Sequence, residues 1–134
     1  MKKTFLLPGL LLFGFAVCVV AQSEADYSGW MKDVVATKGK LKKGIDAKSN
    51  ADVASDAEHL AGIFKQVSAF WAGRNASDAV TISKNAETAS NDLAAAAKAG
   101  DDAKIAASMQ TINGSCGACH MAHREGSQGN FKIK

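Results

Sequence analysis

CGACHMAHR, residues 116–124, contains two cysteines and two of the three histidines of a 134-residue chain. Cys116, Cys119 and His120 form the pattern C-x-x-C-H. In a helix, residues three and four positions apart lie on neighbouring turns of one face. The three side chains can therefore approach one flat ligand from the same side.

This pattern is the attachment signature of c-type haem. Each cysteine sulfur can form a thioether with one of the two vinyl groups at the porphyrin edge, and the following histidine then faces the iron. Imidazole is an ordinary axial ligand of haem iron. We therefore predict one covalently attached haem c, bound through Cys116 and Cys119, with His120 as the proximal iron ligand.

Two other interpretations of the motif stay open. A disulfide between Cys116 and Cys119 would be strained within a helical turn, and redox-active pairs of this spacing occur at helix N-termini. A zinc ion could use both cysteines with His120 and His123, although structural zinc sites usually take ligands from two separate segments. Neither alternative suits the middle of a helix as well as haem does.

Upstream of the motif, alanine is abundant, apolar residues recur at three-and-four spacing, and the only proline is Pro8. These features indicate helices. Gly100 suits a helix end, and Ser77 and Asp101 or Asp102 suit N-caps. We expect helices over residues 26–43, from 50 or 52 to between 67 and 73, over 78–99, and from 102 or 103 through 123, followed by a loose tail, GSQGNFKIK, over 126–134. The predicted fold is all-α, an antiparallel four-helix bundle with the haem between helices.

The N-terminus reads MKKTFLLPGLLLFGFAVCVVAQSEA: two lysines, an apolar run and then small residues around Ala21. This is typical of a secretory signal peptide. We predict a signal peptide over 1–21, a single domain over 22–134 and a periplasmic protein without stable membrane insertion after cleavage. An uncleaved anchor and lipid attachment at Cys18 are the alternatives, although Val17 occupies a position where lipoprotein signals place a small residue.

The formal charge is +3 at pH 7, and two of the lysines lie in the predicted signal peptide. The mature domain would be close to neutral, so we expect no nucleic-acid surface. We find no convincing catalytic constellation of serine, histidine and acid, and no carboxylate pair. We therefore expect a protein that is not an enzyme.

A secreted four-helix chain with C-x-x-C-H on its last helix, followed by the basic Arg124, resembles the cytochrome c-prime family of class II c-type cytochromes. The stretch DDAKIAASMQTINGSCGACH, residues 101–120, is also similar to that family's approach to the haem. His123 departs from the family pattern, which has an aromatic residue there. The resemblance implies a monohaem protein, and in many relatives two copies pair through their first helices, so a homodimer is possible.

The same resemblance implies two functional classes, distinguished by the first helix. Relatives with a first-helix methionine are six-coordinate electron carriers, whereas those with an apolar residue over the iron are five-coordinate and bind nitric oxide or carbon monoxide. In YSGWMKDVV, residues 27–35, Met31 stands where the electron carriers have MK. We predict Met31 as the distal ligand and a single-electron carrier that exchanges electrons with other redox proteins. The alternative is a core Met31, with Trp30, Val34 or Val35 closing an open iron position.

Other candidate ligands fit less well. Met109 lies about 16 Å along the axis of the same helix from His120, and Met121 and His123 also belong to that helix. His59 suits a boundary residue. Trp30 and Trp71 are expected either in the haem wall or in ordinary core, and Arg124 either at a haem propionate or in solvent. The lysine-rich KGKLKKGIDAK, residues 38–48, is either a docking patch for an acidic partner or a solvated helix end.

Overall fold

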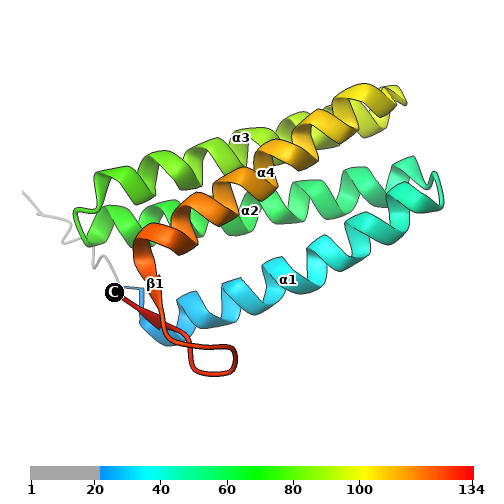
Figure 1. Ribbon diagram of the computed structural model, residues 1–134. Helices are drawn as coiled ribbons and strands as arrows, with labels where there is room; N and C mark the ends of the chain where they lie inside the picture. Colours follow the sequence, from blue (N-terminus) through cyan, green and yellow to red (C-terminus); the bar gives the residue numbers. More distant parts are fainter. Residues whose placement is uncertain (1–21) are drawn as a thin grey trace, which may run out of the picture.

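A computed structural model describes residues 22–134. Four helices make up almost all of it: α1 (Glu24–Asp46), α2 (Asn50–Gly73), α3 (Ser77–Ala99) and α4 (Asp102–His123). Short connections make successive helices antiparallel (Figure 1). The predicted all-α four-helix bundle is confirmed. The predicted signal peptide over 1–21, Cys18 included, lies outside the described residues.

Local hydrogen bonding explains most of the helix ends. The Ser23 hydroxyl accepts from the Asp26 backbone N–H, and the Asp26 carboxylate accepts from the Ser23 N–H, so α1 begins with a capping box. Asp101 caps α4 by accepting from the Lys104 N–H at 3.1 Å. Gly100 ends α3 in the left-handed region at φ 68°. The C-terminal end of α3 at Gly100 and the N-cap of α4 at Asp101 agree with the sequence-based expectation.

The start of α3 differs from the prediction by one residue. Ser77 is the first helical residue, and Ala76 occupies the N-cap position without a side-chain hydrogen bond. The turn after α2 sets this register, because Asn75 adopts φ 58° and the Ala76 N–H donates to the Trp71 carbonyl. The chain therefore enters α3 before a serine cap can form.

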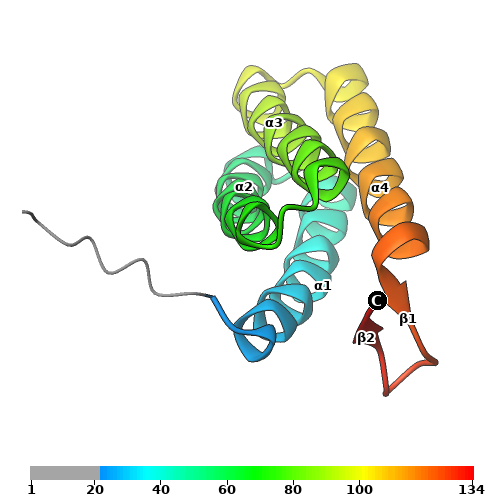
Figure 2. The same ribbon diagram turned by 90° about the vertical axis from the view of Figure 1, so that its left-hand side faces the viewer.

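The centre of the core is the pair α2 and α3. Helix α2 packs against both α1 and α3, and α3 also packs against α4. Viewed from one end, the four helices surround the core in chain order (Figure 2). Helix α3 buries mainly alanines, which allow α2 to approach closely, while α2 supplies the large apolar groups. Each large apolar side chain of α2 stabilises the fold by about 1.5–3 kcal/mol when fully buried.

Helices α1 and α4 are covered less completely than the central pair. Helix α1 buries Val34, Thr37 and Leu41, and α4 buries Ile105, Ser108 and Ile112. Several apolar residues beside them, including Met31, Met109 and Cys116, are only partly buried although they contact the core. The side of the bundle between α1 and α4 therefore offers apolar surface to a further group.

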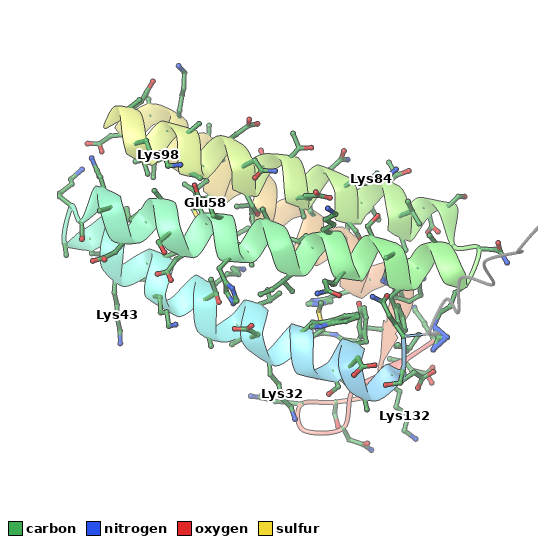
Figure 3. The ribbon with its side chains drawn as sticks, turned by 180° about the vertical axis from the view of Figure 1, so that it is seen from behind. Lys32, Lys43, Glu58, Lys84, Lys98 and Lys132 are labelled. Carbon is green, nitrogen blue, oxygen red and sulfur yellow. The ribbon has the colours of Figure 1, made fainter. Side chains whose placement is uncertain are left out.

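Ion pairs on the outside tie neighbouring helices together. Lys98 of α3 and Glu58 of α2 extend toward each other, whereas Lys32 and Lys43 extend from α1 away from the bundle (Figure 3). Lys48 pairs with Asp102 at 2.6 Å, linking the connection after α1 to the start of α4. Exposed pairs of this kind contribute about 0–1 kcal/mol each. Among residues 22–134, no helix has the length and hydropathy needed to cross a membrane.

The tail after α4 is ordered, and the predicted loose tail is wrong. Strand β1 (Arg124–Glu125) pairs antiparallel with β2 (Lys132–Ile133). Gly126 and Gly129 turn the chain at φ 93° and 89°, angles that glycine adopts without strain. The Arg124 guanidinium stacks 4.0 Å from the Phe131 ring centre, and Ile133 packs against the core. These contacts explain why so short a ladder forms.

Candidate functional site

The three motif residues lie together on the last turns of α4. Cys116, Cys119 and His120 are all half-buried, and Ile112, one turn earlier, is completely buried. Helix α4 runs unbroken to His123, so the C-x-x-C-H spacing does place these side chains on adjacent turns. Their shared face is turned toward the interior, with enough exposure left for a ligand to reach it.

Both sulfurs are free thiols. Burial is the main reason that the pKa of Cys116 and that of Cys119 lie above the ordinary thiol value of 9.0. Both groups are therefore thiols rather than thiolates at neutral pH. No disulfide joins Cys116 and Cys119. In the described part of the chain, no three histidine, cysteine or acidic side chains lie close enough together to bind a metal ion such as zinc.

His120 is electrically suited to an axial role. Its pKa is lowered from 6.5, first by burial and then by the positive charges of Arg124 and Lys38. The imidazole is thus neutral at pH 7, and a neutral ring nitrogen has the lone pair that iron requires.

One face of α1 lies across from the motif. Tyr27, Met31, Val34 and Lys38 follow one another at spacings of four, three and four residues, so they share that face. The Tyr27 hydroxyl lies beside Cys119, and the Lys38 ammonium acts on Cys116 and His120. Since these two residues mark the ends of the face, Met31 and Val34 lie between them along α1.

Of these two inner residues, only Met31 has a ligating atom. Met31 is half-buried, whereas Val34 is buried at 5% exposure. Val35 is 73% exposed and Trp30 packs edge-on to Phe70 with ring centres 6.4 Å apart, so neither closes the face as the sequence allowed. The arrangement presents a thioether and a valine to whatever occupies the space beside His120.

A cavity of about 390 Å³ lies farther along the bundle, between α1 and α4. Its α4 wall begins at Asn113, one turn before Cys116, and includes Met109 and Ile105. Lys38 and Ile45 form part of the α1 wall. Met109 therefore packs against the core and also lines this cavity.

An aromatic cluster closes the other end of the site. Trp71 is 3% exposed and contacts Tyr27 at 5.6 Å and His123 at 4.7 Å between ring centres. Within residues 22–134 the buried Trp71 Nε1–H makes no hydrogen bond of normal geometry. The Tyr27 hydroxyl lies close enough to interact with it, and this interaction lowers the pKa of Tyr27.

The residues present fit a haem c. Two half-buried thiols and a neutral imidazole lie on one face of α4, and apolar side chains line the facing surface of α1. The fit rests on the chemistry of these side chains and on the apolar surface that faces them.

The remaining candidates make other contacts or face solvent. Arg124 belongs to β1 rather than to α4, and its contact with Phe131 directs it to the surface. His59 is exposed and bonds to Asp33 at 2.9 Å. His123 Nε2 bonds to Asp78 Oδ2 at 2.8 Å, and Met121 is 77% exposed.

Sequence reasoning missed Tyr27 and Lys38 as parts of the site. Both lie on the Met31 face, Tyr27 one turn before it and Lys38 two turns after it. Helical spacing from Met31 would have found them. It was the contact with α4, which no local pattern reveals, that gave them a role.

Comparison with known proteins agrees with this arrangement. The family model described as Cytochrome C' matches residues 20–124. A curated cytochrome c' from Rhodospirillum rubrum is 27% identical, and the alignment covers 90% of this chain and 96% of the relative. No solved structure matches the chain significantly.

Proposed function

Because this chain belongs to the cytochrome c' family and carries one covalently attached haem c, we propose that it is a periplasmic carrier of single electrons. In this proposal Cys116 and Cys119 form the thioethers, His120 is the proximal ligand and Met31 the distal one. The observation that carries it is the position of Met31 on the face of α1 that looks toward the motif. No substrate turnover is part of the proposal.

When bound, the haem supplies an iron that gains and loses one electron. The chain's own residues set the conditions for that exchange. Cys116 and Cys119 tether the group, which prevents its loss outside the cytoplasm, and His120 offers a neutral nitrogen. Met31 offers a soft thioether, which favours reduced iron and raises the potential. A fixed ligand on each side suits a carrier because little has to move.

Val34 supports a second function. It is buried beside Met31 on the same face and has no atom that can ligate iron. If Val34 rather than Met31 covers the haem, the sixth position stays open, and the protein binds nitric oxide or carbon monoxide for protection or sensing. The two candidates share the attachment site and differ in one coordination bond.

The absorption spectrum of the mature holoprotein tests the choice. The electron-carrier proposal predicts narrow reduced bands and the weak far-red band of sulfur–iron ligation in the oxidised protein, with very slow uptake of carbon monoxide. Broad high-spin bands with rapid carbon monoxide uptake would reject Met31 ligation and support the second function. Absence of covalent haem after acid extraction would reject the assigned attachment residues.

Partners and location complete the proposal. Electron donors and acceptors would be other redox proteins, and Lys43, which extends from α1 into solvent, belongs to the lysine-rich segment 38–48 that could guide an acidic one (Figure 3). Export would depend on the signal peptide proposed for residues 1–21. Sizing the mature protein by analytical ultracentrifugation would decide whether it forms the homodimer suggested by the resemblance.

A further inference from the structure

Lys38 is a cation in an unusual place for this chain. It is half-buried on α1, seven residues after Met31 and four after Val34, on the face that meets the motif. It also forms part of the cavity wall, opposite Met109 and Asn113 of α4. Its charge acts on the motif. For Cys116 it partly opposes the rise in pKa that burial causes, and for His120 it adds to the fall in pKa that burial causes.

The charge of Lys38 is not neutralised by a neighbour. Among residues 22–134, Lys38 forms no ion pair, whereas the other two lysines of the cavity wall do. Lys42 pairs with Asp46 at 2.8 Å, and Lys48 with Asp102 at 2.6 Å. On the α4 side Lys38 faces Met109 and Asn113 across the cavity and acts on Cys116 and His120, none of which carries a negative charge at neutral pH. The two carboxylates of the cavity wall, Asp46 and Asp102, are paired with Lys42 and Lys48.

We propose that the positive charge of Lys38 raises the reduction potential of the haem held at Cys116, Cys119 and His120. Oxidation adds one positive charge to the iron, and a nearby cation disfavours that change. In the partly buried space between two helices, such an interaction is weakened less by solvent than at the surface. The inference rests on the proposed attachment residues, and it holds whether or not Met31 is the sixth ligand.

Lys38→Gln removes the charge and keeps most of the side chain. We expect the equilibrium constant for reduction by a fixed reference couple to fall about three- to tenfold, where tenfold corresponds to about 59 mV for one electron. Lys42→Gln is the matched control, because it removes the same charge from the same helix at an exposed, paired position. The shift in reduction potential caused by Lys42→Gln should be less than half of the shift caused by Lys38→Gln. Lys38→Arg should restore the wild-type potential.

Redox titration gives the potential, and acid-stable haem content and the two absorption spectra are recorded on each variant. A lowered potential with unchanged spectra, still present in 1 M salt, supports the proposal. Equal shifts in Lys38→Gln and Lys42→Gln, or no shift, would overturn the role of Lys38 and leave the proposed function intact. A changed ligation spectrum in Lys38→Gln would overturn it too, because Lys38 would then act on coordination. Wild-type protein without covalent haem would reject the attachment residues and this inference together.

Discussion

The imidazole ring of His123 lies 4.7 Å from the Trp71 ring, centre to centre, with the planes inclined at 45°. His123 also bonds through Nε2 to Asp78 Oδ2 at 2.8 Å. One side chain three residues after His120 therefore connects the end of α4 to α2 and to the start of α3. The resemblance noted from the sequence expects an aromatic residue at this position, and the ring of His123 provides the same kind of packing together with a hydrogen bond.

The His123–Asp78 bond predicts an acid-dependent contribution to stability. The pKa of Asp78 is lowered from 3.8, first by its hydrogen bond with His123. A carboxyl with a lowered folded pKa stabilises the fold above its unfolded pKa, and this contribution is lost as pH falls through the folded value. Asp78→Asn should therefore lower the melting temperature slightly at pH 7, and the difference from wild type should shrink below pH 3.8. Asp92→Asn, an exposed change on the same helix, is the control. A difference that stays constant down to pH 2 would refute the linkage.

Met31→Ala tests the proposed distal ligand directly. If the thioether binds iron, its removal opens the sixth position, and the narrow six-coordinate spectrum should become high-spin with rapid carbon monoxide uptake. The potential should fall as well, because the soft ligand that favours reduced iron is gone. Truncation of this side chain should lower the free energy of unfolding by at most about 4 kcal/mol, because Met31 is only half-buried.

Met109→Ala is the matched control for that experiment. Met109 lines the cavity farther along α4, on the helix that carries His120, and should leave the spectrum unchanged. A high-spin shift in both variants would mean that packing rather than ligation controls the spectrum. An unaltered spectrum in Met31→Ala would remove Met31 from the iron.

Tyr27 predicts a titration that can be followed without interference from other tyrosines, because it is the only one in the chain. Its pKa is raised from 10.0 to about 12, first by burial and then by the neighbouring Cys119. Because the pKa is higher in the folded than in the unfolded protein, the neutral Tyr27 side chain contributes its full stabilisation of the fold below pH 10. This stabilisation is lost as pH rises through 12. The shift corresponds to about 2–3 kcal/mol, before allowance for the exposed part of the ring.

The tyrosinate absorbance of the holoprotein should therefore appear with a midpoint above pH 10, because burial, the largest cause of the shift, does not depend on the thiols that become thioethers. Tyr27→Phe should lack this signal and should lose less stability than wild type between pH 10 and 12. A midpoint near 10 in the folded protein would place the hydroxyl in solvent.

Features set by neighbouring residues were predictable from the sequence. The C-x-x-C-H motif needs only one helix, and Gly100 and Asp101 mark the end of α3 and the start of α4. Local spacing determines each of these features.

Features that depend on which helix lies opposite were not predictable in this way. The contact of Tyr27 with Cys119 and the field of Lys38 at His120 require the rotation of α1 relative to α4. The ordered tail depends on Phe131 meeting Arg124 and on Ile133 reaching the core. Local polarity and two glycines favoured a loose tail, and tertiary contacts reversed that preference.

Two glycines of α1 predict opposite responses to the same substitution. A Cβ at Gly44 would lie 2.9 Å from Val53 Cγ2, and Val53 is completely buried, so it cannot move aside easily. At Gly39 nothing lies within 4 Å of the added atom. Alanine in a helix interior is favoured over glycine by about 0.5–1 kcal/mol, whereas overpacking costs about 1–3 kcal/mol.

Gly39→Ala should therefore raise the free energy of unfolding by about 0.5–1 kcal/mol, and Gly44→Ala should lower it by about 1–2 kcal/mol, the balance of the two effects. Urea unfolding followed by circular dichroism measures both. Because the helix-propensity gain is shared, the difference between the variants isolates the contact with Val53. Stabilisation by both substitutions would show that α1 and α2 lie farther apart at this crossing. If the steric contact is the cause of the loss, Gly44→Ala should cost less when it is made in a Val53→Ala background than in the wild type, because the crowding methyl group is gone.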